Sequence, residues 1–173
     1  MSTSSRNRDA TEEDLMTRLW RTQFDTKIIQ LHEGTPIEEV AEITDEQYRP
    51  GGMAALQDAV GLNLLAVEKR YQEVQVKPDA IFCAIITDGE ENSSEEYTGE
   101  QIKQMIEERQ ANPDWKISFI GAEQTAWIQG ERLGVHRDSI MSTAPQDTAA
   151  TMRMMSNDVR AFTSSKKKGR PQN

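Results

Sequence analysis

The fold of this chain is decided by residues 80–89, which read Ala-Ile-Phe-Cys-Ala-Ile-Ile-Thr-Asp-Gly. The first seven are apolar without alternation, which is typical of a strand buried on both faces in a parallel sheet covered by helices. In open parallel sheets, ligands bind outside the carboxyl ends of the strands. Asp88 therefore stands where a metal or phosphate ligand belongs, although a hydrogen-bonded Asp-Gly turn explains the same residues equally well.

Helical and extended patterns alternate around this run. Upstream, apolar residues recur at steps of three and four over 56–74, which predicts a helix. Thr98 and Gln101 have the spacing of a capping box, which predicts the start of another helix. Further strands are predicted over 19–25, 27–31 and 115–120, and one within 135–141. Further helices are predicted from Thr11, over 125–133 and over 146–162, and Gly134 ends the second of these. This alternation predicts an α/β fold with a mainly parallel sheet.

The length of 173 residues fits one domain. We expect a flexible N-terminus over 1–10, a domain over 11–162 and a disordered basic tail over 163–173. The formal net charge is -9 although the tail is basic, so the body should repel nucleic acid and anionic membranes. Such a body suits cations or a basic protein partner.

Cys83 is the one cysteine, so no intrachain disulfide can form. Its place inside the apolar run predicts an unreactive core thiol. No apolar stretch resembles a signal peptide or a membrane span. We therefore expect a cytoplasmic protein in a reducing compartment.

Several blocks of the sequence, which follow one another in the same order as in that family, resemble the von Willebrand factor type A (vWA) domain in its stand-alone bacterial and phage form. The blocks are QFDT at 23–26, GTPIEEV at 34–40, YRPGGM at 48–53, AIITDGEENSSEEYTGEQIK at 84–103 and FIGA at 119–122. Together they cover roughly residues 19–162. The resemblance implies a three-layer α/β sandwich acting as a non-catalytic protein-interaction module.

The family's function implies a magnesium site, the metal-ion-dependent adhesion site, built from an Asp-x-Ser-x-Ser motif, a threonine and a later aspartate. On this resemblance Asp88 matches the later aspartate, whereas Ala54 stands at the threonine position and the Asp-x-Ser-x-Ser motif is absent. The site is thus predicted to be degenerate, with no cofactor or only weakly bound magnesium. The predicted partner-binding residues are Gly52, Met53, Ala54, Asp88, Gly89, Glu90, Glu91, Asn92 and Ser93.

The missing motif also implies a missing central strand, which in the family lies between the strands that carry Phe24 and Ile85. Its loss would leave two rows of unpaired backbone groups. The two neighbours could close up and pair directly. Alternatively, another chain could donate a strand in a homo- or hetero-oligomer, or the gene product could begin upstream of Met1.

Two other functions compete with the interaction module. A metal-assisted hydrolase could use Asp88 with Glu90 or Glu91, but no His, Cys or Lys accompanies them in the loop to act as base or nucleophile. A structural or assembly component could instead join a partner through an open sheet edge.

Overall fold

The computed structural model describes residues 17–41, 54–75, 77–87, 89, 91–122, 125–144 and 147–168. The helix predicted from Thr11 and the flexible N-terminus over 1–10 lie outside these residues. The described chain begins with an antiparallel hairpin of β1 (Arg18–Phe24) and β2 (Ile28–Pro36), followed by the 3-10 helix η2 (Ile37–Glu39). Both predicted strands are therefore confirmed, and the second is longer than its pattern indicated.

Helix α1 (Leu56–Glu73) follows the predicted periodicity over most of its length. Its apolar stripe buries Leu56, Val60 and Leu64 in the core, and Val67 packs against them. At its side, the hydroxyl of Thr22 in β1 donates a hydrogen bond of 2.8 Å to Oδ1 of Asn63. The helix thereby anchors the hairpin.

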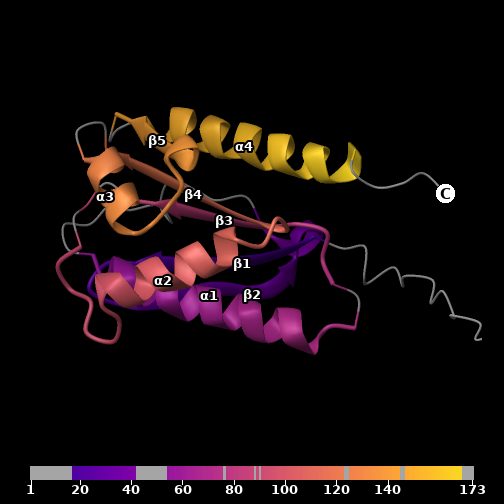
Figure 1. The fold of residues 1–173 in the computed structure, drawn as a ribbon, viewed down its shortest axis with the longest axis horizontal. Coiled ribbons are helices and arrows are strands. Elements are labelled where there is room, and N and C mark those ends of the chain that lie inside the picture. Colours follow the sequence, from indigo (N-terminus) through magenta and orange to yellow (C-terminus); the bar gives the residue numbers. More distant parts are fainter. Residues whose placement is uncertain are drawn as a thin grey trace, which may run out of the picture.

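The second half of the chain forms a parallel sheet of β3 (Ile81–Ile86), β4 (Trp115–Ala122) and β5 (Ile140–Thr143), in the order β3-β4-β5. Helix α2 (Gly99–Gln110) connects the first pair, and α3 (Ala126–Arg132) with the 3-10 helix η3 (Arg137–Ser139) connects the second. The predicted α/β class with parallel strands is confirmed. Figure 1 shows α4 (Thr148–Lys168) running along one side of this sheet, and α1 and α2 lying on the other.

The structure confirms the predicted start of α2 and the predicted end of α3, and α4 is longer than predicted. Thr98 caps α2 in a complete capping box with Gln101. Gly134 follows α3 with a φ of +78°, a backbone conformation that glycine adopts without strain. Helix α4 continues to Lys168, into the segment expected to be a disordered tail. There Lys166 donates to Asp114 at 2.8 Å, which ties the last turn to the loop before β4.

The strands form two separate sheets, β1-β2 and β3-β4-β5. Within the described residues no ladder joins β1 to β3, so these strands do not close up and pair directly. The prediction that residues 80–86 form a strand buried on both faces is correspondingly wrong in one respect. Only Ile85 is fully buried and the rest of β3 is partly exposed, because β3 is an edge strand of its sheet.

None of the helices in the described part of the chain combines the length and the apolar character that crossing a membrane requires.

Candidate functional site

The predicted partner-binding residues, called the rim from here on, come from two segments of the chain: residues 52–54, which precede α1, and residues 88–93, which follow β3. Ala54 forms a parallel β-bridge with Glu91. The N–H of Asn92 donates to the carbonyl of Ala54 at 3.3 Å, and Oδ1 of Asn92 accepts from the N–H of Ala54 at 3.1 Å. The structure thus brings together segments that are almost forty residues apart in the sequence.

Five of the nine predicted rim residues are described: Ala54, Gly89, Glu91, Asn92 and Ser93. Gly52, Met53, Asp88 and Glu90 lie outside the described residues. Gly89 borders Ala54, since a Cβ on this glycine would lie 3.9 Å from that of Ala54. Ala54 itself is buried and offers no side-chain oxygen to a cation.

The carboxylate of Glu91 is used to hold the rim loop on the start of α1. Oε2 accepts from the N–H of Gln57 at 2.8 Å and from the hydroxyl of Ser94 at 2.7 Å. Oε1 accepts from the N–H groups of Ser93 and Ser94, both at 2.9 Å. The N–H of Gln57 is one of the donors left free at a helix start, so Glu91 acts as a cap supplied from a distant segment.

These hydrogen bonds set the protonation of Glu91. Partial burial by itself raises the pKa of the carboxyl, but the four donors from Gln57, Ser94 and Ser93 outweigh it. The net pKa is lowered from its ordinary value. Glu91 therefore stays ionised, which suits an anchoring acceptor and not a proton donor.

Asp58 is a residue of this site that the sequence reasoning missed. Its side chain is buried in the first turn of α1. Its two oxygens accept from the backbone N–H groups of Glu95, Glu96 and Tyr97 at 2.8, 3.0 and 2.8 Å. An acid in a first helical turn is a common surface feature, so the sequence gives no sign that this one fixes a loop thirty-seven residues away.

Asp58 and Glu91 thus make a reciprocal brace between α1 and the loop that joins β3 to α2. The N–H of Asp58 also donates to the hydroxyl of Ser94 at 3.1 Å. Asp58 accepts three hydrogen bonds and Glu91 four, all from the chain itself, and these occupy most of the lone pairs that a cation would need. Among the described residues, no group of three or more His, Cys, Asp or Glu side chains could hold a metal ion.

Cys83 lies in β3, away from the rim, and packs against the core. Burial raises the pKa of its thiol to about 11, and the opposing effect of the Arg109 charge is smaller. Since the thiolate is the nucleophile, this thiol is not suited to catalysis.

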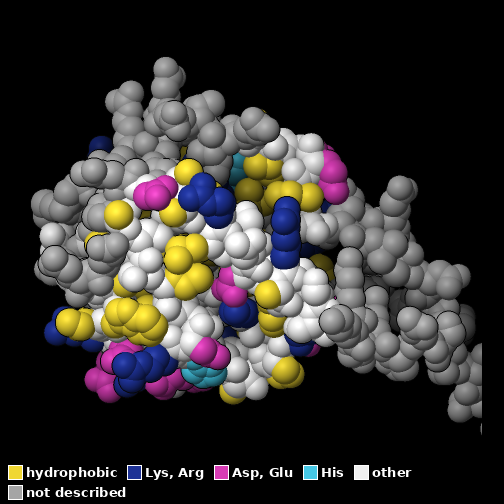
Figure 2. Space-filling view, turned by 90° about the horizontal axis from the view of Figure 1, so that it is seen from above, with side chains coloured by type: hydrophobic (Ala, Val, Ile, Leu, Met, Phe, Trp, Pro, Cys, Tyr) yellow, Lys and Arg dark blue, Asp and Glu magenta, His cyan; other side chains and the backbone are white. Residues whose placement is uncertain are grey.

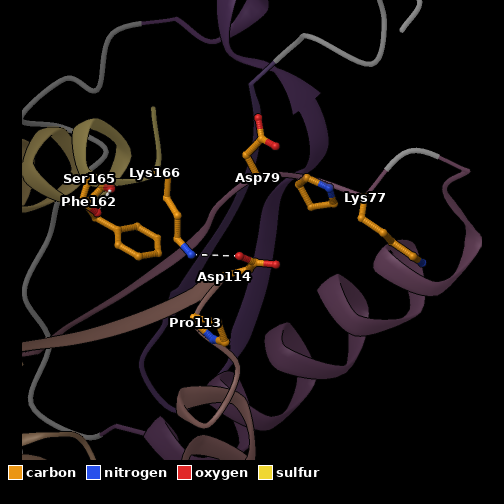
Figure 3. Close-up of a pocket in the computed structure, with 8 residues that line it drawn as sticks. Lys77, Asp79, Pro113, Asp114, Phe162, Ser165 and Lys166 are labelled. Carbon is orange, nitrogen blue, oxygen red and sulfur yellow. Dashed lines mark hydrogen bonds and ion pairs between the residues drawn. The ribbon is translucent and has the colours of Figure 1, made fainter. Parts of the chain in front are cut away.

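One hollow in the described surface lies at the end of the sheet opposite to the rim, beside the starts of β3 and β4 (Figure 3). It has a volume of about 650 Å³ and is lined by Lys77, Pro78, Asp79, Pro113, Asp114, Phe162, Ser165 and Lys166. Figure 3 shows Lys166 directed at Asp114, to which it is hydrogen bonded. The contact that fixes the end of α4 is therefore part of the lining of this hollow, which is separate from the rim.

No family model, curated protein or solved structure matches this chain.

Proposed function

We propose that this chain is a non-catalytic, cytoplasmic protein-interaction module of the vWA type, with a three-layer sandwich and a degenerate metal-ion-dependent adhesion site. The observation that supports this most directly is the use of the Glu91 carboxylate. All four of its hydrogen bonds come from the chain itself, so it rigidifies the rim and is not free to act as a base or a metal ligand. Ala54 stands where the resembled family has a threonine, so the side-chain oxygen of that threonine is missing from the same place.

The partner surface in this proposal is the braced rim, made of Ala54, Gly89 and residues 91–93 together with Gly52, Met53, Asp88 and Glu90. A loop held at both ends by Asp58 and Glu91 presents its backbone in one geometry, which lowers the ordering cost of binding a protein. The acidic net charge favours a basic protein surface over nucleic acid or membrane. Figure 2, which views the molecule from above Figure 1, shows basic, acidic and hydrophobic side chains interspersed on that face.

A photo-crosslinking residue at Ser93 tests this proposal, with the same residue at Ser165 in α4 as the matched control at the opposite end of the sheet. We expect a discrete protein adduct from Ser93 only, unchanged when EDTA replaces magnesium. Calorimetry with Mg²⁺ should find no saturable site tighter than about 1 mM. Magnesium-dependent phosphoester hydrolysis that is lost in Asp88→Asn would instead favour the hydrolase.

A second candidate function is supported by the interrupted sheet. With β1 and β3 in separate sheets, a structural or assembly role through an open sheet edge has a specific place in the fold. Unpaired strand edges are templates for pairing with another chain.

A further inference from the structure

Arg109 is a charged residue that the fold buries without using most of its hydrogen-bond donors. Its side chain is only 10% exposed, because it follows Ile102 and Ile106 on the face of α2 that packs into the core. A guanidinium group has five N–H donors. Nη1 donates to the carbonyl of Met105 at 2.9 Å, whereas Nε is buried and has no hydrogen-bond partner in the described part of the chain.

The third nitrogen of Arg109, Nη2, is weakly paired as well. It lies 3.6 Å from Oε2 of Glu68 in α1, which is too long for a hydrogen bond. Nε and Nη2 form one edge of the guanidinium, and the two parallel N–H bonds of such an edge match the two oxygens of a carboxylate. Buried polar groups are nearly always paired. An unused fork in the interior therefore indicates an acceptor that comes from outside the chain.

Arg109 lines a second hollow, which has a volume of about 390 Å³. This hollow lies at the end of the sheet opposite to the rim, where β4 begins, between the neighbouring helices α1 and α2 (Figure 1). Its volume falls within the range of small-molecule sites, about 300–1,000 Å³. The residues that line it are Glu68 and Tyr71 of α1, Glu108 and Arg109 of α2, and Asn112 and Trp115.

The fork of Arg109 is held in a fixed orientation beside a further donor. Its Cζ lies 5.6 Å from the ring centroid of Trp115, and stacking on an aromatic ring restrains a guanidinium. Oδ1 of Asn112 accepts from the N–H of Asp114 at 2.9 Å, which leaves the amide Nδ2 to donate to a ligand. Donors that are oriented before a ligand arrives lower the cost of binding it.

The acids of the hollow determine which carboxylate fits. Two acids, Glu68 and Glu108, stand against one Arg109 in the lining, so a simple carboxylate would be attracted by the guanidinium and repelled by both acids. Lys77, which lies 4.5 Å above the ring of Tyr71, lines the neighbouring hollow instead. A ligand with one carboxylate and two cationic groups would match these three charges. Basic α-amino acids have this composition.

We propose that the second hollow is a binding site for a free basic α-amino acid, such as L-lysine or L-arginine. The ligand carboxylate binds side-on to Nε and Nη2 of Arg109, with Nδ2 of Asn112 as a third donor. The α-ammonium group and the side-chain cation face Glu68 and Glu108, and the aliphatic part of the ligand packs on Tyr71. The site is separate from the rim and does not depend on a partner protein there.

Titration of the unmodified chain followed by NMR tests the site. The reporters are the Nε–H of Arg109 and the indole N–H of Trp115. L-lysine should shift both signals along one saturable curve with a Kd below about 1 mM. It should also slow exchange of the Arg109 Nε–H at least about tenfold, because this proton gains an acceptor.

Three analogues of the ligand each lack one of its charged groups. Cadaverine has no carboxylate, L-norleucine has no side-chain ammonium group, and Nα-acetyl-L-lysine has no α-ammonium group. The last also imitates the final residue of a protein that ends in lysine. Each analogue should bind at least about tenfold more weakly than L-lysine.

Matched variants provide the second arm of the test. Arg109→Lys keeps the positive charge but removes the fork, and it should lower the affinity for L-lysine at least about tenfold. Arg132→Lys makes the same change at an exposed position of α3 and should leave the affinity unchanged. If Arg109→Lys does not fold, Glu68→Gln replaces it: the amide keeps the shape, removes the charge and should weaken binding at least about threefold.

Four results would overturn the site. They are no shift of either signal at about 10 mM L-lysine, cadaverine binding as tightly as L-lysine, unchanged affinity in a folded Arg109→Lys, and an Arg109 Nε–H that exchanges as slowly before the titration as after it. The last result would mean that a buried water or Glu68 already accepts this proton. Nα-acetyl-L-lysine binding as tightly as L-lysine would also overturn the free amino acid, because the ligand would then be a protein C-terminus.

Discussion

At the scale of single residues, Glu91 and Asp58 determine whether the rim is an active centre or a braced surface. Asp58 lies in α1 and accepts hydrogen bonds from the loop before α2. Glu91 lies in that loop and accepts a hydrogen bond from α1. Hydrogen bonds to ionised acceptors contribute more than neutral ones. We therefore expect the stability of the rim to depend on the charge of these side chains.

Glu91→Gln should lower the free energy of unfolding at pH 7 by about 1–2 kcal/mol, because the new amide nitrogen would face either the N–H donor of Gln57 or those of Ser93 and Ser94. The matched variant is Glu95→Gln, whose exposed side chain should cost no more than about 0.5 kcal/mol. Urea unfolding of both variants is the measurement. Equal costs would contradict the brace.

The stability that Glu91 contributes depends on pH, because the pKa of its carboxyl is lowered in the folded chain. A carboxyl with a depressed folded pKa stabilises the fold above its unfolded pKa, about 4.3, and loses that contribution as pH falls through the folded value. The difference between the unmodified chain and Glu91→Gln should thus be full at neutral pH and shrink below about pH 4. A difference that stays constant down to pH 3 would exclude an ionised cap.

Residue roles of this kind were only partly predictable. The apolar run over residues 80–86 predicted strand β3, after which the loop with Glu91 follows, and Ala54 was expected beside this loop, where the β-bridge to Glu91 lies. The use of each acid was not predictable, because the partners of Asp58 and Glu91 are backbone N–H groups. Any residue supplies such a donor, so the sequence carries no signature of the pairing.

At the scale of elements, α1 and the loop before α2 must approach each other closely for the brace to form. Gly61 permits this approach, since a Cβ there would lie 2.8 Å from Cδ2 of Tyr97. Gly99, at the first turn of α2, has more room: its Cβ would lie 3.5 Å from Nε2 of Gln57. The two glycines differ in packing although both lie in helices.

Gly61→Ala should destabilise the chain by about 1–3 kcal/mol through overpacking against Tyr97, despite the higher helix propensity of alanine. Gly99→Ala is the control and should be neutral or stabilising by up to about 1 kcal/mol. Thermal unfolding followed by circular dichroism distinguishes them. If both substitutions stabilise, the approach of Tyr97 to α1 is not as described.

Elements were more predictable than contacts because their signals are local. The apolar periodicity predicted α1, the capping-box spacing predicted the Thr98 cap, and apolar runs predicted strands β3 and β4. Each of these patterns lies in neighbouring residues. The burial of β3 was overestimated, since an apolar strand reads alike whether it lies at the centre or at the edge of a sheet. Strand order depends on pairing between distant segments, and the periodicity of one segment cannot report it.

At the scale of the whole molecule, two sheets share one set of covering helices. Helix α1 holds β1 through Asn63 and contributes Leu56, Val60 and Leu64 to the core of the parallel sheet. The far side of that sheet is tied to α4 by Asp158, which accepts from Ser118 at 2.5 Å and pairs with Lys116. These ties hold the hairpin and the sheet in one core, although among the described strands no backbone ladder joins them.

Among the described residues the sheet is interrupted beside β3, and amide exchange in the chain without any ligand reports on this interruption. In dilute protein followed by NMR, Phe82, Ala84 and Ile86 should exchange at least about tenfold faster than Cys83 and Ile85, whose N–H groups face β4. Equal, strong protection of all five amides in a monomer would mean that this edge is already paired and that the sheet is continuous there.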